Sequence, residues 1–540
     1  MRMSFASPHP DVTIPDSSVY DYLFGGIEEA DLDRPALVDT KPEKATTTYR
    51  DLIARVDAFA GALADRGIAV GDVVGLLSPN SSAFAIAFHG ILRSGATATT
   101  INALFTPNDI AKQLTDAKAS MLVTVSVLAD GAKAAVEQLG LAKDRLIILD
   151  GEGEAASGHP NAADLLGPNH PAPDVSFDPS THIAVLPYSS GTTANPKGVM
   201  LTHRNLVSNV CQIRPLQGMQ ADDVILAVLP FFHIYGMTVL LNAALHARAS
   251  LVIMPRFDLP EFLDNIATEK CTYGFIAPPV AVALAKHPLV EKYDLSSLHT
   301  VMSGAAPLDA ELGHAVEKRI GCRMVQGYGM SELSPVSHVI PFDGGKAIAG
   351  HDAELSSSGW TVPNAESKLV DPATGEEIPL PSDGLSETGE LWFKGPNVMK
   401  GYLNNDAATA ETIDADGFLH TGDLAQVDPT GCVFIVDRLK ELIKYKGYQV
   451  PPAELEALLL SHPQIADAAV IGVTDTESGE EVPKAFVVKQ PDAEISADEV
   501  MAFVADKVAP YKKVRQVEFI EAVPKSAAGK ILRKDLRTKA

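Results

Sequence analysis

Residues 71–93 read GDVVGLLSPNSSAFAIAFHGILR, and they set the pattern for much of the chain. Gly71 and Asp72 open a short apolar, partly β-branched run from Val73 to Leu77, which predicts a buried strand. After a polar turn, the stretch from Ser81 to Arg93 has the length and apolar content of a helix. Strands that alternate with helices along a chain predict parallel sheets with helices on their faces.

The same alternation continues on both sides of this stretch. Upstream, Thr48 followed by Asp51 is typical of a capped helix start, and apolar residues then recur at helical spacing. Downstream, the run from Met121 to Leu128 predicts another strand. Residues 151–180 are rich in Gly, Pro, Asn and Asp, which indicates an excursion over the surface.

The last hundred or so residues follow a different, more compact pattern. The elements that we expect there are a helix from Pro452 to Leu460, strands from Ala468 to Val473 and from Ala485 to Val488, and a helix from Ala497 to Val508. A unit of this size is normal for an independent domain. The sequence thus predicts an α/β protein with a large N-terminal domain of several subdomains, residues 1–436, and a small mobile α+β C-terminal domain, residues 437–540.

Composition narrows the classes of function. The chain has 540 residues, of which 46% are hydrophobic and 21% charged, which excludes a fully disordered protein. A formal net charge of −25 argues against a nucleic-acid-binding protein, which needs a basic surface. The best apolar stretch, Met237 to Leu245, is too short to span a bilayer. We therefore expect no integral membrane segment and a cytoplasmic location.

One loop carries the strongest local signal for chemistry. Residues 188–198 read YSSGTTANPKG and follow an apolar strand. Their hydroxyl groups, backbone amides and lysine are suited to holding a triphosphate. A Walker A loop would need Ser or Thr directly after Gly-Lys, whereas Lys197 is followed by Gly198. Taken alone, this loop is equally consistent with an ordinary surface turn rich in serine and threonine.

Further motifs follow at long intervals. They are SGAAPL at Ser303–Leu308, QGYGMSE at Gln326–Glu332, GFLHTGD at Gly417–Asp423, DRLKELIKYKG at Asp437–Gly447 and PKSAAGK at Pro524–Lys530. Together with the loop, and in this order, they resemble the acyl-adenylate-forming superfamily of acyl-CoA synthetases, luciferases and peptide-synthetase adenylation domains. PFFHIY at Pro230–Tyr235 and KELIKYKGYQ at Lys440–Gln449 are most similar to the 4-coumarate–CoA ligase branch. The resemblance extends from about Tyr20 to Arg533.

The resemblance implies a two-step reaction on three small molecules, a carboxylic acid, ATP and coenzyme A, with Mg²⁺ as cofactor. The acid attacks the α-phosphorus of ATP to give an acyl-adenylate and pyrophosphate, and the thiol of coenzyme A then displaces AMP. Both nucleophiles belong to substrates, so the protein contributes positioning and charge stabilisation. The acid implied is 4-coumarate or a related hydroxycinnamate. A medium-chain fatty acid, a carrier-protein thiol in place of coenzyme A, and a luciferase-type oxidation of the adenylate remain alternatives.

A catalytically inactive nucleotide sensor is a further alternative. The presence of Lys197, Glu332, Asp423 and Lys530 argues against it, because an inactive relative would be expected to have lost at least one of them. The sequence leaves open whether the protein is a monomer or a homodimer.

By the resemblance, the nucleotide site has three parts. The β- and γ-phosphates are held by Ser189, Ser190, Gly191, Thr192, Thr193 and Lys197. Adenine and AMP contact Ala305, Gln326, Gly327, Tyr328 and Ser331. The ribose contacts Asp423, Arg438 adds a further contact to the nucleotide, and Mg²⁺ is held by Glu332. The chain departs from the usual pattern at Ala194-Asn195, at Ser331 in place of Thr and at Pro451 in place of Ala. None of these departures removes a charge or a hydrogen-bond donor that the chemistry needs.

The remaining implied sites concern the acid, coenzyme A and catalysis. The catalytic residues are Lys530, His233, Lys444 and Gln449; the acyl pocket is formed by Tyr235, Gly236, Gly304, Gly329, Pro335 and Val336; and coenzyme A contacts Arg256, Lys446 and Gly447. Glycines leave flat space that suits a planar aryl-propenoate, and Tyr235 is expected to hydrogen-bond a ring hydroxyl. Lys530 serves the first step and the segment at Lys446 the second, so we expect the C-terminal domain to turn about Lys440 between them.

Overall fold

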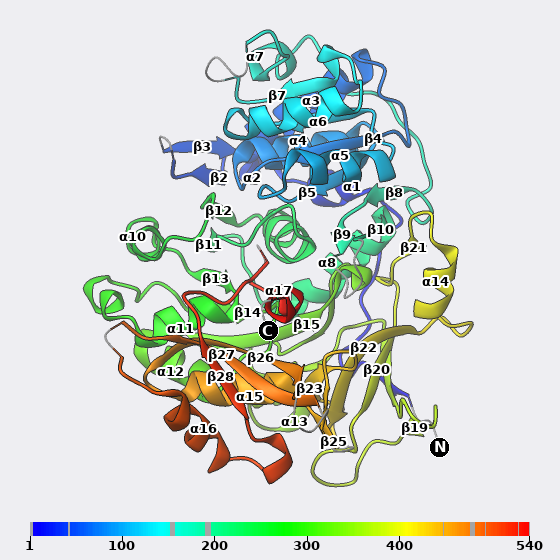
Figure 1. The fold of residues 1–540 in the computed structure, drawn as a ribbon. Helices are drawn as coiled ribbons and strands as arrows, with labels where there is room; N and C mark the ends of the chain where they lie inside the picture. The colour runs from blue at the N-terminus through cyan, green and yellow to red at the C-terminus, as the bar shows by residue number, and fades with distance from the viewer. Residues whose placement is uncertain are drawn as a thin grey trace.

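The computed structural model of the chain describes residues 4–41, 44–151, 157–189, 196–445, 448–475, 481–491, 493–526 and 529–538. Residues 4–438, here called the body, contain two large sheets flanked by helices and a third, antiparallel sheet (Figure 1, blue to yellow). Residues 443–538, here called the lobe, form a smaller unit beside the body (Figure 1, orange to red). This arrangement confirms the predicted α/β class with parallel sheets flanked by helices.

The first large sheet is built mainly from the N-terminal half of the body. In spatial order its strands are β21 (Gly401–Tyr402), β10 (Lys197–Thr202), β8 (Ile183–Val185), β5 (Thr97–Ile101), β4 (Val73–Leu77), β6 (Met121–Thr124) and β7 (Leu146–Ile148), with β9 (Tyr188–Ser189) beside β10. The strands from β8 to β7 pair in parallel, whereas β10 runs antiparallel to β8, β9 and β21.

The second large sheet lies next to the first and combines segments far apart in the sequence. Its strands are, in spatial order, β17 (Trp360–Thr361), β16 (Val336–Val339), β15 (Arg323–Gly329), β14 (Thr300–Ser303), β13 (Tyr273–Ile276), β11 (Val224–Ala227), β12 (Ser250–Ile253), β2 (Pro35–Asp39) and β3 (Ala45–Thr48). The central strands from β15 to β2 pair in parallel, and antiparallel strands close both edges.

Helices cover both large sheets, and most of them share one continuous hydrophobic core with the sheets. Residues of the helices at 107–116 and 129–138 instead pack with the first sheet in a separate cluster. The longer ones are α1 (Val19–Phe24), α3 (Tyr49–Asp65), α4 (Ser82–Arg93), α5 (Pro107–Asp116), α6 (Ala129–Gln138), α8 (His203–Gln217), the π-helix η4 (Tyr235–Asn242), α9 (Ala243–Ala247), α10 (Leu259–Glu269), α11 (Pro278–Lys286), α12 (Ala310–Ile320) and α14 (Asp406–Thr412). Shorter turns of helix are α2 (Glu29–Leu32), η1 (Ser126–Leu128), η2 (Lys143–Arg145), α7 (Ala162–Leu165), η5 (Pro288–Lys292), η6 (Ser331–Leu333) and α13 (Lys346–Ala349).

The third sheet of the body is antiparallel throughout and leads to the lobe. Its strands are β1 (Phe5–Ala6), β18 (Glu366–Val370), β20 (Gly389–Lys394), β22 (Leu419–Val427) and β23 (Val433–Arg438), with β19 (Glu377–Ile378) beside β18. Leu369, Leu391 and Val433 belong to its small separate core. The last strand, β23, ends at Arg438, one residue beyond residue 437, where we predict the boundary. The placement of that boundary stays a prediction.

The lobe packs around hydrophobic clusters of its own. Its elements are β24 (Ile443–Tyr445), β25 (Tyr448–Val450), α15 (Pro452–Ser461), β26 (Ile465–Thr474), β27 (Glu481–Lys489), α16 (Ala497–Ala505), η7 (Pro510–Lys512), β28 (Gln516–Phe519) and α17 (Arg533–Arg537). The sheet β26-β27-β28 carries α15 and α16, and β24 pairs with β25 in a separate hairpin. The predicted order of helix, two strands and helix is confirmed.

Local signals in the sequence locate several elements closely. The strand predicted from Val73 to Leu77 coincides with β4. Helix α4 starts after Ser81, whose side chain accepts a hydrogen bond from the amide of Phe84, and α3 starts after Thr48, which caps it in the same way. The N-cap residues are therefore functioning as the sequence predicts.

Other boundaries differ from the predictions. The strand expected from Met121 to Leu128 ends at Thr124, and the 3₁₀ turn η1 follows it, because the strand has reached the edge of its parallel neighbours. Helix α16 ends at Ala505 rather than Val508. Among the described helices, none combines the length and the apolar character needed to cross a membrane.

Candidate active site

A cavity of about 290 Å³ lies where the body meets the lobe. Its wall is formed by the carboxyl ends of β14 and β15, by α8 and the π-helix η4, by segments next to β5 and β9, and by Lys530 of the lobe. Sites at the carboxyl ends of parallel strands are the rule in α/β proteins, because the loops that follow these strands converge there. The cavity therefore joins residues that lie more than 400 positions apart in the chain.

One end of the cavity is mainly apolar. Ile213, Val239, Met302, Val336 and Val339 line it, together with the ring of Tyr235 and with Pro335. The first five are aliphatic side chains of the body, and most of them belong to its continuous core. An apolar group can therefore bind here without removing water from a charged side chain. The shape of this end is set by packed side chains.

Glycines shape the apolar end. A β-carbon at Gly304 would lie 2.8 Å from the ring of Tyr235, and one at Gly329 would overlap the carbonyl oxygen of Pro335. The Tyr235 hydroxyl donates a long hydrogen bond of 3.5 Å to the backbone oxygen of Met302, and burial raises the pKa of this phenol. Gly304 thus permits the close packing of Tyr235 that keeps the cavity open.

The other end of the cavity is polar. Ser189, Ala305, Gly327, Tyr328, Ser331, Glu332 and Arg438 line it. All of these were predicted as nucleotide or metal contacts, and the structure brings them together around one space. Their individual roles remain predictions.

Asp423 lies behind this wall and is joined to two of its members. Its carboxylate accepts a hydrogen bond of 2.6 Å from the Tyr328 hydroxyl and lies 3.5 Å from Nε of Arg438. Burial raises the pKa of Asp423, although Arg438 and Tyr328 act in the opposite direction. The carboxylate is buried and held in place before any ligand arrives.

Lys530 enters the cavity on a tight loop of the lobe. The amide of Ser526 donates to the backbone oxygen of Lys530 at 2.8 Å, and Gly529 has a φ of 83°, which glycine adopts without strain. Burial lowers the pKa of Lys530 to about 8, with Arg438 acting in the same direction. Burial likewise lowers the pKa of His233 to about 4, with a further contribution from Lys530, so this imidazole is neutral near pH 7.

Tyr402 is a contact of this end that the sequence motifs do not indicate. The ammonium of Lys197 lies 4.5 Å from the centre of the Tyr402 ring, and the hydroxyl of Tyr402 donates to Oε1 of Glu332 at 2.9 Å. One side chain therefore contacts both the predicted phosphate lysine and the predicted metal carboxylate. Only the pairing of β21 with β10 brings Tyr402 to this position.

Glu332 is the cavity residue that we predict to hold a divalent cation. It is 5% exposed, and it lines the cavity. Among the residues that the structure describes, no cluster of three or more His, Cys, Asp and Glu side chains could hold a metal by itself. A single protein carboxylate fits Mg²⁺, which in nucleotide sites takes its other ligands from phosphates and water.

Several predicted residues do not line the cavity. The side chain of Gln326 is buried and bonded to the backbone of Leu308 and Leu355, so it supports the wall from behind. Gly236 packs against the backbone of Pro230. Arg256 is exposed on the loop after β12. The direct contacts that we predict for these three residues stay predictions.

Lys444 and Gln449 lie on the β24-β25 hairpin of the lobe, directly opposite each other in register. Lys444 is exposed, and its backbone amide donates to Glu481 at 2.7 Å. Lys440, the predicted hinge, is exposed in the turn between β23 and β24. The predicted contacts at Ser190, Gly191, Thr192, Thr193, Lys446 and Gly447 lie outside the described residues.

Most of the apolar lining was not predicted from the sequence. Thr100, Ile213, Gln217 and Val239 line the cavity but belong to no motif. Gln217 is nevertheless specifically placed, because its amide donates to the backbone oxygen of Val239 at 3.1 Å. Their only signal is that they are apolar or buried residues of helices and strands, which describes many core positions equally well.

The sequence of the chain matches known protein families and known ligases over most of its length. The family described as AMP-binding enzyme matches residues 27–403, and the family described as AMP-binding enzyme C-terminal domain matches residues 454–530. The 4-coumarate–CoA ligase 2 of Solanum tuberosum is 43% identical over 99% of this chain and 96% of its own length. The 4-coumarate–CoA ligase 1 of Arabidopsis thaliana is 42% identical over 99% and 95%, respectively.

A solved structure shows the same architecture. The anthranilate CoA ligase AuaEII, determined in complex with anthranoyl-AMP, superimposes with a TM-score of 0.88 at 26% sequence identity. The superposition covers 97% of this chain and 98% of that one, so it includes the elements of both the body and the lobe.

Proposed function

The chain belongs to the AMP-binding enzyme family, and from this premise we propose that it joins a hydroxycinnamate such as 4-coumarate to coenzyme A at the expense of ATP. It is an AMP-forming acid–thiol ligase. The observation that carries the substrate proposal is that the apolar side chains, the polar side chains and Lys530 line one cavity. A planar aryl-propenoate fits such a cavity with its ring in the apolar end and its carboxylate toward the lysine.

In the first step, a carboxylate oxygen attacks the α-phosphorus of ATP, the bond to the bridging oxygen breaks, and pyrophosphate leaves. Negative charge builds on the α-phosphate oxygens as the new bond forms. We assign the neutralisation of this charge to Lys530, which lines the cavity, and its burial would make the interaction stronger than it would be in water. We assign a hydrogen bond to the carboxylate to His233, which also lines the cavity and is neutral near pH 7.

The nucleotide is held by the polar end. We assign the ribose hydroxyls to Asp423, a further contact with the nucleotide to Arg438, and the adenine and AMP to the segment from Gly327 to Ser331 with Ala305. Lys197 is assigned to the outer phosphates. Mg²⁺, when bound beside Glu332, would offset the charge of the triphosphate.

In the second step, the thiol of coenzyme A attacks the acyl carbonyl carbon, the thioester forms and AMP leaves with the electron pair of the anhydride bond. We propose that the lobe then turns about Lys440, which withdraws Lys530 from the cavity. The same turn would bring the β24-β25 hairpin, with Lys444 and Gln449, to the adenylate. Support comes from the exposed turn at Lys440 and from the separate core of the lobe. Contacts of coenzyme A with Arg256, Lys446 and Gly447 are part of the same proposal, as are a cytoplasmic location and a monomeric or homodimeric state.

The test is a panel of acids assayed with and without coenzyme A. Cinnamates, benzoates and medium-chain fatty acids are each supplied with ATP and Mg²⁺, and AMP, pyrophosphate and thioester are measured. We expect the highest kcat/KM with hydroxycinnamates, and thioester formation equal to AMP release. Faster turnover of fatty acids would contradict the proposed substrate, and pyrophosphate release without thioester would contradict the second step.

A further inference from the structure

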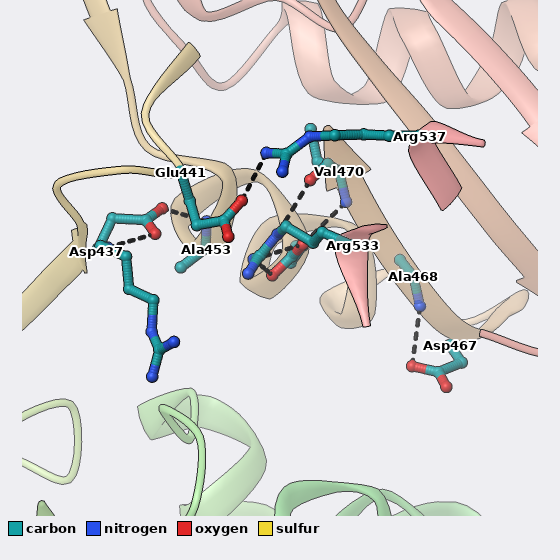
Figure 2. A network of polar contacts seen from close by, with 10 residues as sticks. Asp437, Glu441, Ala453, Asp467, Ala468, Val470, Arg533 and Arg537 are labelled. Carbon is teal, nitrogen blue, oxygen red and sulfur yellow. Dashed lines mark hydrogen bonds and ion pairs between the residues drawn. The ribbon is translucent and has the colours of Figure 1, made fainter. Parts of the chain in front are cut away.

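Helix α15 of the lobe is held by the body at its N-terminal end. Oδ2 of Asp437 accepts a hydrogen bond of 2.8 Å from the amide of Ala453, in the first turn of α15 (Figure 2). Asp437 lies on β23, in register with Leu424 of β22, and so belongs to the third sheet of the body. Its side chain is buried, and its Oδ1 accepts from the amide of Arg438 at 2.6 Å, which fixes the carboxylate.

The same helix is held by the body at its C-terminal end. The ammonium of Lys286, the last residue of α11, donates a hydrogen bond of 2.8 Å to the backbone oxygen of Leu460. The first amides and last carbonyls of a helix have no partners within it, and they carry partial positive and negative charge, respectively. A carboxylate at the first turn and an ammonium at the last turn therefore both match the dipole of α15.

The middle of α15 holds the segment that follows Lys530. Both carboxylate oxygens of Glu456 accept from Arg533, at 2.8 and 2.7 Å, and one of them also accepts from the amide of Val470 at 2.8 Å. Nε of Arg533 donates to the backbone oxygen of Val470 at 3.3 Å, as Figure 2 shows. Both side chains of this ion pair are nearly buried. Arg533 is three residues beyond Lys530.

The other side of the Lys530 loop is attached to the same strand. Lys525 pairs with Asp467 of β26 at 2.6 Å and forms an isolated bridge with Ile531, which closes the loop. Lys530 therefore stands on a loop tied at both sides to β26 and α15. Its position over the cavity follows from where α15 docks.

We propose that Asp437 and Lys286 are positioning residues for the adenylation step: by holding the two ends of α15 they place Lys530 in the cavity. The proposal rests on the proposed function and on the turn about Lys440. Both residues precede Lys440 and stay with the body when the lobe turns. The two contacts with α15 must then break, so they support the first step and are absent from the second.

The experiment compares the two half-reactions in Lys286→Met. Adenylation is followed as acid-dependent exchange of pyrophosphate into ATP, and thioester formation is followed in a single turnover from the preformed acyl-adenylate and coenzyme A. We expect exchange to fall about tenfold, the scale of one hydrogen bond to a charged group, and thioester formation to keep its rate. Lys286→Arg, which keeps a charged donor, should recover most of the exchange rate.

Two further variants sharpen the result. Lys292→Met removes a neighbouring exposed lysine for which the described residues show no contact with α15, and it should leave both half-reactions unchanged. Asp437→Ala should act in the same direction as Lys286→Met, and thermal melting reports whether it folds. An equal fall in both half-reactions, or no fall in exchange for the folded Lys286→Met, would overturn the proposal. Absence of exchange in the unaltered protein would instead contradict the proposed function.

Discussion

The two ends of the cavity are built in different ways. The apolar end consists of body residues that belong to one continuous core, so its shape is present whatever the lobe does. The polar end is completed by Lys530. The loop that carries Lys530 is held to the rest of the lobe by ion pairs and hydrogen bonds. In the proposed function, selection of the acid therefore depends on the packed interior of the body, whereas charge neutralisation depends on the docking of a separate unit. Substitutions at the two ends should therefore affect different kinetic parameters.

The largest effect is expected for Lys530→Met. Loss of one preorganised charge contact in a buried site reduces the rate of the step that it serves by roughly 10²–10³-fold. We expect pyrophosphate exchange to fall by this amount, while thioester formation from preformed acyl-adenylate stays within a few-fold of the unaltered rate. An equal fall of the two half-reactions would mean that the lysine serves both steps, and the contrast between the two ends would lose its basis.

A smaller effect, confined to the acid, is expected for Gly304→Ala. The new methyl group would lie 2.8 Å from the Tyr235 ring and would push it toward the apolar end. Overpacking of this kind costs about 1–3 kcal/mol, so we expect the KM for the acid to rise roughly tenfold while the KM for ATP is unchanged. Gly274→Ala is the matched control, because its nearest side-chain neighbours would be 3.8 Å away. A rise in the KM for ATP alone would show that Gly304 affects the polar end, and it would contradict the assignment of Gly304 to the acid.

The rate of adenylation, which depends on the polar end, should also respond to pH. The pKa of Lys530 is lowered to about 8, so the ammonium is present below this pH and is lost as the pH rises through it. Because adenylation needs the charged form, kcat/KM for the acid should fall about tenfold per unit well above pH 8. The measurement is a pH profile of pyrophosphate exchange. Lys530→Arg, whose guanidinium stays charged, should flatten this limb, and an unchanged limb in that variant would assign it to another group.

The smallest effect is expected for Tyr402→Phe. The substitution removes the hydrogen bond to Glu332 and keeps the ring face beneath Lys197. Loss of about 1 kcal/mol predicts a fivefold decrease in kcat/KM for ATP, with the acid KM unchanged. Tyr402→Leu, which removes both contacts, should show a larger decrease. Equal decreases for the two variants would indicate that the ring contact contributes nothing.

The sequence predicted the local elements more accurately than the assembly. Thr48 and Ser81 mark helix starts because a capping side chain acts within three residues of itself. The antiparallel third sheet was not predicted, because β1 pairs with β18, a strand more than 350 residues away. Pairing over such distances leaves no local pattern to read.

The candidate site shows the same division. Ser189, Tyr328, Glu332 and Lys530 could be named in advance because each stands in a motif whose residue types suit phosphate or metal chemistry. Gln326 was also named, but its side chain is used to bond Leu308 and Leu355, and only the folded chain shows this. Tyr402 and Val239 could not be named, since an aromatic or aliphatic residue carries no sign of what it will contact.

What the amino-acid order alone determined is the class of fold, the family resemblance and the set of polar groups that the chemistry needs, because these depend on residue type and short spacing. Only the tertiary structure decided which of these groups share one cavity, which support it from behind, and how α15 connects Lys530 to Asp437 and Lys286. The reason is physical. A hydrogen bond or an ion pair depends on distances of a few ångströms, and for residues hundreds of positions apart those distances are set by the packing of the whole chain.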